Sequence, residues 1–319
     1  MKFVIFCHDV HTGGPFALLQ LNKALNDLGC RSEMLFHDKA NLDLQKKEGL
    51  FKVEYTDQIK LSVDDLDYDL CHQFGMDDVL IFPEMMVGVA TKMHALGHRK
   101  RIFWWLSWDN VPLIEIKKFS NHVSLNSCVH IFQSHYARAE ANRLGFDGPI
   151  VSDYTLLAGQ TVVPTQKTTD FCYLVTKSPG VEGLIDSLIN FTIMPIYDMD
   201  HRQVQKVLQN SKFFIDFGPQ PGKDRIPREA ILNGCIPIVR KMGAACLYED
   251  VPIPGYLKID TAVLSDGELL AQTLVDLNAN IEHVRRQLRP YTNQIESEKA
   301  MFYDQVRSFM GLHFGEIAN

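Results

Sequence analysis

The sequence predicts an α/β protein of two domains, and three observations support this class. Short β-prone runs alternate with segments of helical period along most of the chain, which is the pattern of parallel sheets covered by helices. An aperiodic stretch at residues 158–170 divides the alternation into two series. Apolar residues at helical spacing then recur from Leu270 to Phe309, so the chain ends in helices. We therefore expect two Rossmann-like domains.

The first domain is expected at residues 1–157 and begins with a strand at residues 2–7. Pro15 opens a helix whose leucines share one face, and Gly29 suits the end of this helix. Five more apolar runs predict strands, and two further helix starts lie between or after them. The strands are expected at residues 34–36, 69–74, 79–82, 101–108 and 129–133, with helix starts at Pro83 and after Ser134.

The second domain is expected at residues 171–290, and a C-terminal helix at residues 291–319 completes the chain. The run Ser265-x-x-Glu268 has the form of a capping box at the start of the terminal helices, and Pro290 breaks or bends them. Strands are expected at residues 171–175, 191–197, 213–216 and 235–239, with helices at residues 181–189 and after an Asp200 cap.

The loop and the short helix between the last two of these strands predict an anion-binding site. The loop is rich in Gly and Pro and carries charges of both signs. Pro227 suits the first turn of a helix that Arg228 and Glu229 open, and Gly234 suits its C-terminal end. A helix N-terminus at the carboxyl end of a strand binds anions. Basic side chains beside a glutamate there predict a ligand with both phosphates and hydroxyls.

This segment resembles the donor-sugar loop of glycosyltransferases of the GT-B type, and its pattern is most like that of family four. In that family a glycine-containing loop leads to a helix with Glu-Ala, and a strand of Gly-x-Pro-hydrophobic form follows. Glu229 matches the glutamate that holds the nucleotide ribose, and residues 234–239 match the strand. The family carries a second acid eight positions before that glutamate. Pro221 stands there in this chain, with Asp216 and Asp224 the nearest acids.

The resemblance implies two domains with a cleft between them and a last helix that packs back on the first domain. It implies a transferase that needs neither a metal nor a cofactor, because side chains and helix ends neutralise the leaving diphosphate. A glycine pair after the first strand matches a family position near the donor phosphates and the acceptor. A lysine after the strand at 171–175 matches a family position near the donor diphosphate. The implied donor-binding residues are Gly13, Gly14, Lys177, Lys223, Arg225, Glu229 and Gly243.

Two aspartates, Asp109 and Asp224, are expected to act in catalysis. Asp109 follows the strand at 101–108, at the edge where open α/β sheets bind their ligands, so it can serve as a base or bind acceptor hydroxyls. A helix N-cap before Pro112 would explain Asp109 equally well. Asp224 lies in the donor loop, between Lys223 and Arg225, and is our candidate for the acid that Pro221 replaces.

Composition and charge exclude several classes of protein. The formal net charge is −7, which argues against a nucleic-acid partner. No apolar run approaches the ~20 residues that span a bilayer, and the first residues become polar too early for a signal peptide. The seven cysteines include no CxxC pair, which indicates reduced thiols. We expect a cytoplasmic protein, and peripheral contact with the inner face of a membrane stays open.

The predicted function is transfer of a sugar from a nucleotide-sugar donor to a glycan, lipid-linked or other hydroxyl acceptor, as in polysaccharide biosynthesis. The departure at Pro221 supports an alternative, a non-catalytic nucleotide- or carbohydrate-binding module. A dinucleotide-linked oxidoreductase is disfavoured because no GxGxxG follows the first strand. His8, Asp9 and His11 resemble metal ligands, but no further ligands complete a site, so no metal is predicted.

Overall fold

The computed structural model describes residues 1–45, 49–156, 166–178, 181 and 190–315. The chain divides into two compact units: unit 1 comprises Met1–Tyr154 with Lys299–Asn319, and unit 2 comprises Thr155–Glu298. The predicted helix at 181–189 and most of the predicted linker at 158–170 lie outside the described residues. Among the described helices, none combines the length and the apolar character that a bilayer crossing requires.

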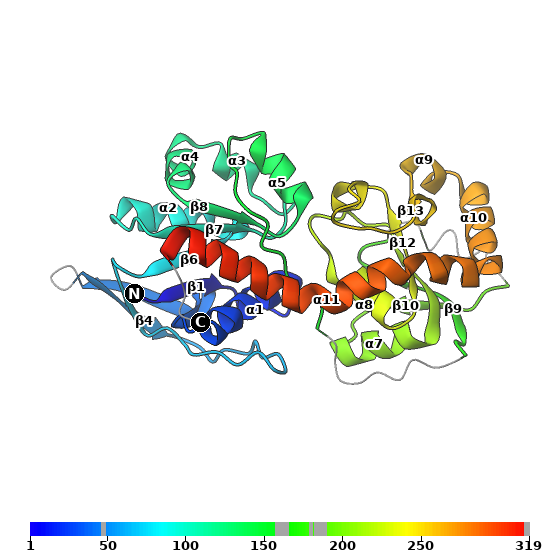
Figure 1. Ribbon diagram of the computed structural model, residues 1–319, viewed down its shortest axis with the longest axis horizontal. Helices are drawn as coiled ribbons and strands as arrows, with labels where there is room; N and C mark the ends of the chain where they lie inside the picture. Colours follow the sequence, from blue (N-terminus) through cyan, green and yellow to red (C-terminus); the bar gives the residue numbers. More distant parts are fainter. Residues whose placement is uncertain (46–48, 157–165, 179–180, 182–189, 316–319) are drawn as a thin grey trace. The chain divides into compact units, whose positions relative to one another are not determined.

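Unit 1 is built on a parallel sheet covered by helices. Its elements are β1 (Phe3–Cys7), α1 (Gly13–Asp27), β2 (Ser32–Phe36), β6 (Val79–Pro83), η2 (Glu84–Met86), α2 (Val87–Ala95), β7 (Arg101–Trp105), α3 (Leu113–Ile116), α4 (Phe119–Asn126), β8 (Val129–Phe132) and α5 (His135–Asn142). The strand order is β2-β1-β6-β7-β8, and all pairs are parallel. Helix α1 lies on one side of the sheet, and α2 and α4 lie on the other (Figure 1). The strands are buried on both faces, which explains their continuous apolar runs.

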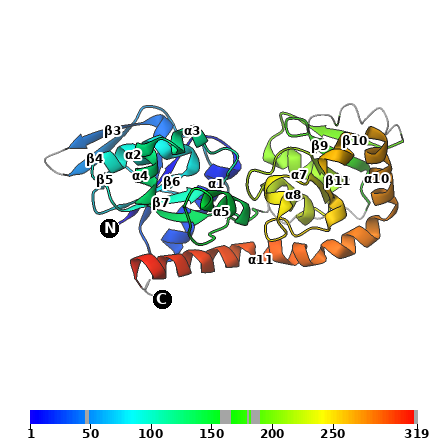
Figure 2. The same cartoon turned by 90° about the horizontal axis from the view of Figure 1, so that it is seen from above.

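A small antiparallel sheet in unit 1 was not predicted, although its strand Gln73–Gly75 overlaps the strand expected at residues 69–74. It consists of β3 (Ala40–Gln45), β4 (Leu50–Tyr55) and β5 (Gln73–Gly75), which lie side by side (Figure 2), and η1 (His37–Lys39) precedes it. Phe51 and Val53 of β4 enter the core, and the alternate residues Lys52 and Glu54 are exposed. The alternation of apolar and polar residues that marks a half-buried strand is therefore present in the sequence.

Unit 2 contains a second parallel sheet with the order β10-β9-β11-β12-β13. Its elements are β9 (Thr169–Leu174), β10 (Ile193–Ile196), α7 (His201–Asn210), β11 (Ser211–Asp216), α8 (Arg225–Leu232), β12 (Ile236–Arg240), η3 (Gly243–Cys246), η4 (Gly255–Leu257), β13 (Lys258–Ile259), α9 (Thr261–Leu264), α10 (Gly267–Ala279) and α11 (Ile281–Phe314). In each unit the second strand of the parallel sheet pairs with one edge of the first strand, and the later strands continue from its other edge. This creates a topological switch point, between β1 and β6 in unit 1 and between β9 and β11 in unit 2.

The terminal helices differ from the prediction in two respects. Helix α10 begins at Gly267, and its cap is Asp266, whose carboxylate accepts a hydrogen bond from the Leu269 N–H; the predicted capping box at Ser265 is therefore wrong. Helix α11 runs without interruption through Pro290, so the break that was one of the two expected effects of this proline does not occur. A proline removes only one backbone donor and tertiary packing can compensate for it.

The part of α11 that belongs to unit 1 packs against α1 and the last residues before the unit boundary. The Tyr303 hydroxyl donates to the Asp27 carboxylate, with 2.6 Å between the oxygens. The rings of Phe302 and Tyr154 lie 5.5 Å apart. Through these contacts the last part of α11, which is far away in the sequence, completes the packing of unit 1.

Candidate functional site

The carboxyl ends of β9 and β11 form the centre of the candidate site in unit 2. These strands are neighbours in the sheet and flank the switch point of the unit (Figure 1). Ligands of open α/β sheets bind in the crevice outside such a point. Lys177 follows β9, and Asp216 is the last residue of β11. The topology therefore brings a predicted donor-binding residue and a buried acid to one edge.

The loops at this edge are packed so closely that two glycines have no room for a side chain. A Cβ at Gly218 would lie 2.4 Å from the carbonyl oxygen of Lys177, and a Cβ at Gly243 would lie 2.1 Å from that of Gln220. Gly243 also has φ of +59°, in the region that favours glycine. The Ala244 N–H donates to the Gln220 carbonyl at 2.8 Å. Backbone contacts thus fix the loops around Lys177.

One lysine and two aspartates form a charged cluster at the same edge. The Lys177 ammonium group pairs with the Asp224 carboxylate. Burial alone would lower the pKa of Lys177, but the charges of Asp224 and Asp216 outweigh burial and raise it. Burial raises the pKa of Asp216 to about 6, against the opposing charge of Lys177. The Oδ2 atom of Asp216 is buried and has no hydrogen-bond partner in the described part of the chain.

Helix α8 begins beside this cluster, with Asp224 as its N-cap residue. The Asp224 side chain makes no capping hydrogen bond and pairs with Lys177 instead. The helix starts at Arg225, three residues before the predicted start, so Glu229 lies in its second turn. The helix dipole acts mainly within the first turn. The charge of Glu229 is therefore balanced by side chains and not by the helix end.

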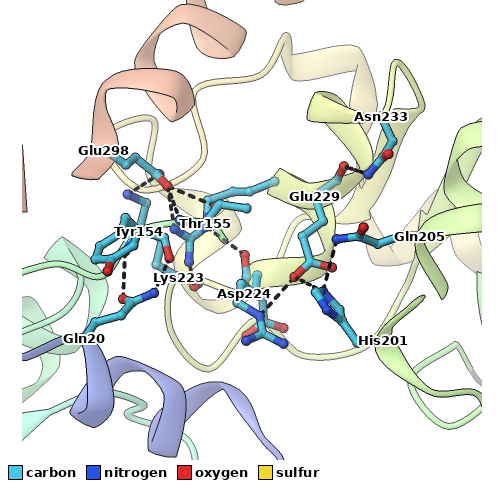
Figure 3. Close-up of polar contacts among 12 residues, drawn as sticks. Gln20, Tyr154, Thr155, His201, Gln205, Lys223, Asp224, Glu229, Asn233 and Glu298 are labelled. Atoms are coloured by element: carbon cyan, nitrogen blue, oxygen red, sulfur yellow. Dashed lines mark hydrogen bonds and ion pairs between the residues drawn. The ribbon is translucent and has the colours of Figure 1, made fainter. Parts of the chain in front are cut away.

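Glu229 is a buried carboxylate whose two oxygens have different surroundings. Oε1 lies 3.1 Å from Nε of Arg225 and 3.2 Å from Nε2 of His201 (Figure 3). Gln205 in turn has its Nε2 atom 3.3 Å from Nε2 of His201. Oε2 is buried and, among the described residues, lacks a hydrogen-bond partner. A buried acceptor without a donor costs free energy, so Oε2 suits a hydroxyl group of a ligand.

A second polar cluster ties the loop before α8 to α11 within unit 2. Glu298 accepts hydrogen bonds from Arg228 at 2.8 Å and from the backbone and hydroxyl of Thr155 at 3.0 Å each (Figure 3). The ammonium group of Lys223 lies 2.8 Å from Glu298 Oε1. Burial would raise the pKa of Glu298, but Arg228 and Lys223 outweigh it and lower that pKa. The predicted contact of Lys223 with phosphate stays a prediction, since its ammonium already pairs here.

Gly13 and Gly14 lie in unit 1, in the first turn of α1. The helix begins two residues before Pro15, where its start was predicted. A Cβ at Gly13 would meet no atom within 4 Å, and one at Gly14 would meet only the Leu106 side chain at 3.6 Å. Packing within the chain therefore does not require glycine at either position. The open space at this helix N-terminus suits the close approach of a ligand.

Glu84 is a buried acid beside the switch point of unit 1 that sequence reasoning missed. It follows β6, is almost completely buried, and its Oε2 atom accepts a hydrogen bond from the Leu106 N–H at 3.1 Å. Burial raises its pKa to about 7. Leu106 begins the loop that carries Asp109, and Asp109 is exposed and accepts a hydrogen bond from the Tyr136 hydroxyl at 2.8 Å. An acid directly after a strand was the available signal.

In the loop with His8, Asp9 and His11, the Asp9 side chain holds a neighbouring loop in place through backbone hydrogen bonds. The Asp9 carboxylate accepts hydrogen bonds from the N–H groups of Lys60 at 3.0 Å and Leu61 at 2.6 Å. Within the ranges that the structure describes, no group of three or more His, Cys, Asp or Glu side chains could hold a metal ion. Independence from metals remains a prediction.

The predicted site residues thus occupy four places. Lys177 and Asp224 pair at the edge of the unit 2 sheet, where Gly243 packs against the loop at Gln220. Arg225 and Glu229 pair on α8, Lys223 pairs with Glu298, and Gly13, Gly14 and Asp109 lie in unit 1. In unit 2, sequence reasoning missed His201, Arg228 and Glu298. Of these three, only His201 had a signal, because it follows the Asp200 helix cap at the end of a strand-to-helix loop.

Comparison with solved structures identifies the fold. A trehalose-6-phosphate synthase structure from E. coli, bound with UDP-2-fluoro glucose, has a TM-score of 0.63, 10% identity and 98% of both chains covered. Sucrose-phosphate synthase from Thermosynechococcus elongatus has a TM-score of 0.62 and 12% identity, covering 98% of this chain and 97% of that one. S. aureus TarM, in complex with Fondaparinux, alpha-GlcNAc-glycerol and UDP, has a TM-score of 0.56 and 10% identity, covering 95% and 100%.

These similarities extend over nearly the whole chain at low sequence identity, so they define the fold. The chain has the fold of GT-B glycosyltransferases. No protein-family model and no curated protein matches the sequence. The predicted GT-B fold is therefore confirmed, and the assignment to family four remains a prediction.

Proposed function

We propose that this protein is a glycosyltransferase that moves a sugar from a nucleotide-sugar donor to a hydroxyl group of a glycan or lipid-linked acceptor. One observation carries the proposal: the switch point of unit 2 gathers Lys177, the start of α8 and the buried Glu229 on one sheet edge. Structures with the same fold support it, since one is bound with UDP-2-fluoro glucose and another is in complex with UDP.

The donor would be held by groups suited to its three parts. The Lys177 ammonium and the N-terminus of α8 would bind the diphosphate, whose charge develops further as the glycosidic bond breaks. The unpaired Oε2 of Glu229 would accept from a ribose hydroxyl, with Arg225 and His201 holding Oε1. The close-packed turn at Gly243 would face the base or a phosphate. This arrangement uses no metal and no cofactor.

The acceptor side is proposed for unit 1. The first turn of α1 at Gly13 and Gly14 leaves room for a ligand, and Asp109 is exposed on a loop that Glu84 anchors. A carboxylate in such a place can accept the proton of an acceptor hydroxyl. Once the donor diphosphate has displaced the Asp224 carboxylate from Lys177, Asp224 would contact the donor sugar. The predicted cleft between the domains and membership of family four belong to this proposal.

The experiment that tests the donor site compares UDP with its 2′,3′-dideoxy analogue in calorimetric titrations. Glu229→Gln should weaken UDP binding, because charged hydrogen bonds contribute roughly 1.5–3 kcal/mol each. The dideoxy analogue should bind wild type weakly, and Glu229→Gln should weaken it little further. Glu268→Gln is the control, an exposed acid in α10 of the same unit. Equal affinity of wild type for both nucleotides would contradict the role of Glu229.

A non-catalytic binding module is the second candidate, favoured by the ion pair that occupies Asp224 and by Pro221. Incubation with UDP-glucose and other nucleotide-sugars separates the two functions. A glycosyltransferase releases the nucleoside diphosphate by transfer or slow hydrolysis. Tight nucleotide-sugar binding without any release, with and without glycan acceptors, would establish the binding module instead.

A further inference from the structure

The helical layer of η2, α2, α3 and α4 in unit 1 exposes large apolar side chains to solvent. These elements pack against one another on one side of the sheet (Figure 1). Ile114 and Phe119 are 81% and 84% exposed, the highest values among the large apolar side chains of the described residues. Leu113 and Val123 next to them are exposed as well. Single exposed apolar residues are ordinary, but a group of them on adjacent helices marks an interaction surface.

The exposed charges of the same layer are mostly basic, although the protein as a whole is acidic. Residues 84–95 and 113–126, which form these elements and the link between α3 and α4, carry Lys92, Lys117 and Lys118 against Glu84 and Glu115, in a chain of net charge −7. Glu84 is buried and Glu115 pairs with Lys118 at 2.6 Å, so Lys92 and Lys117 exceed the exposed negative charge of the layer. Lys117 and Lys118 are exposed between α3 and α4, directly beside Ile114 and Phe119 in the sequence. The apolar group therefore has cationic neighbours.

We propose that this apolar–basic surface, formed by Leu113, Ile114, Lys117, Lys118, Phe119 and Val123, docks onto an anionic lipid bilayer. The apolar side chains would enter the boundary between headgroups and acyl chains, and the lysines would remain at the lipid phosphates. The exposed lysines beside these apolar side chains favour an anionic bilayer over an apolar protein groove as the occupant.

The position of the surface fits the acceptor side of unit 1. Helix α3 follows the loop after β7 that carries Asp109, so the surface adjoins the place where the acceptor is expected. The proposal rests on the proposed function only in that a lipid-linked acceptor gives the contact its purpose. Bilayer binding itself requires no donor.

Cosedimentation with vesicles of phosphatidylcholine, alone or with phosphatidylglycerol, tests the proposal. Wild type should bind the mixed vesicles and dissociate as salt is raised. The Ile114→Ser/Phe119→Ser variant should lose about tenfold or more in partitioning, since burying one such side chain fully is worth at least about one tenfold step. Lys117→Gln/Lys118→Gln should lose the preference for phosphatidylglycerol. Leu312→Ser, the control, alters a residue 76% exposed at the end of α11 and should bind as wild type.

Each contrary outcome overturns the proposal. Wild type that ignores both vesicles, or an equal loss in Leu312→Ser, would reject the surface. A dimer in light scattering that Ile114→Ser/Phe119→Ser abolishes, without vesicle binding, would assign the surface to a second copy of the chain. UDP calorimetry on the same samples keeps the two hypotheses apart. Retained UDP binding with lost vesicle binding supports the docking surface, and intact docking without UDP binding contradicts only the proposed function.

Discussion

The ion pair of Lys177 and Asp224 makes opposite predictions for its two partners. If the Lys177 ammonium holds the donor diphosphate, the Asp224 carboxylate competes with diphosphate for the same cation. Lys177→Ala should therefore weaken UDP binding, and Asp224→Asn should strengthen it. If the ion pair had only a structural role, the two substitutions would not have opposite effects. Loss of either partner would then weaken UDP binding.

The exposure of the two side chains sets the magnitude. The Lys177 side chain is 37% exposed and that of Asp224 is 17% exposed, so solvent screens the pair. The ion pair should contribute about 1 kcal/mol of net free energy, the upper end for surface pairs. Removing its carboxylate should therefore lower the Kd for UDP about fivefold. Loss of the ammonium should cost roughly 2–3 kcal/mol of phosphate binding, a rise of about 30- to 150-fold in Kd.

Calorimetric titration with UDP at fixed pH and ionic strength measures both effects. Lys212 and Asp170 provide a matched control, because they form a 2.6 Å ion pair with side chains 31% and 17% exposed at the amino ends of the same two strands. Lys212→Ala and Asp170→Asn should leave the affinity unchanged. A loss of affinity in Asp224→Asn would refute the competition. Equal effects in the control pair would refute the location of the site.

Three further predictions concern unit 2. Affinity for UDP-glucose, whose phosphates do not titrate near neutral pH, should fall as pH rises through about 6, because Asp216 ionises there and repels the diphosphate; Asp216→Asn should abolish this dependence. Glu298→Gln should lower the free energy of unfolding by about 3–5 kcal/mol, because Arg228 would be buried without its carboxylate. The pKa of Glu298 is lowered, so its stabilisation is present above the ordinary value of 4.5 and is lost as pH falls through the folded-state pKa. Gly243→Ala should lower the free energy of unfolding by about 1–3 kcal/mol and weaken UDP binding, since the new Cβ would lie 2.1 Å from a carbonyl oxygen. Gly267→Ala is the control and should have neither effect, because its Cβ would meet no atom within 4 Å.

The measurements for these predictions have clear contrary results. A pH profile for UDP-glucose that is identical in wild type and Asp216→Asn would remove Asp216 from the site. Urea unfolding that shows the same deficit for Glu298→Gln at pH 7 and in acid would show that the loss is not electrostatic. If Gly267→Ala destabilises the protein as much as Gly243→Ala, the close approach at Gly243 is not the cause.

The parallel sheets were predictable because their strands are buried on both faces. Residues 3–7 and 101–105 are buried throughout, and such strands appear in a sequence as unbroken apolar runs. The antiparallel sheet is harder to predict because its strands are only half-buried. Phe51 and Val53 alternate with exposed residues in β4, and such a period-two pattern is a weaker signal than an unbroken apolar run. The strand at 101–108 was predicted three residues too long, since the apolar Leu106 and Trp108 lie in the following loop.

The side-chain partners of the site could not be predicted, because they depend on which distant segments meet. Glu298 and Arg228 are 70 positions apart, and nothing in the pattern of α11 indicates that one of its acids faces the donor loop. The start of α8 was also misplaced. A proline is tolerated both directly before a helix and in its first turn. Pro227 therefore did not distinguish a start at Arg228 from the actual start at Arg225.

The charges around Lys177 determine what must change before this site can bind a diphosphate. Two carboxyl groups flank this lysine, one paired with it and one buried with a raised pKa, so the cluster has no surplus positive charge when both are ionised. A diphosphate brings further negative charge. Its binding is then favoured if Asp224 leaves Lys177 and if Asp216 takes up a proton. Both adjustments follow from the same cluster, and so the fivefold gain expected for Asp224→Asn and the loss of pH dependence expected for Asp216→Asn test one electrostatic argument at two residues.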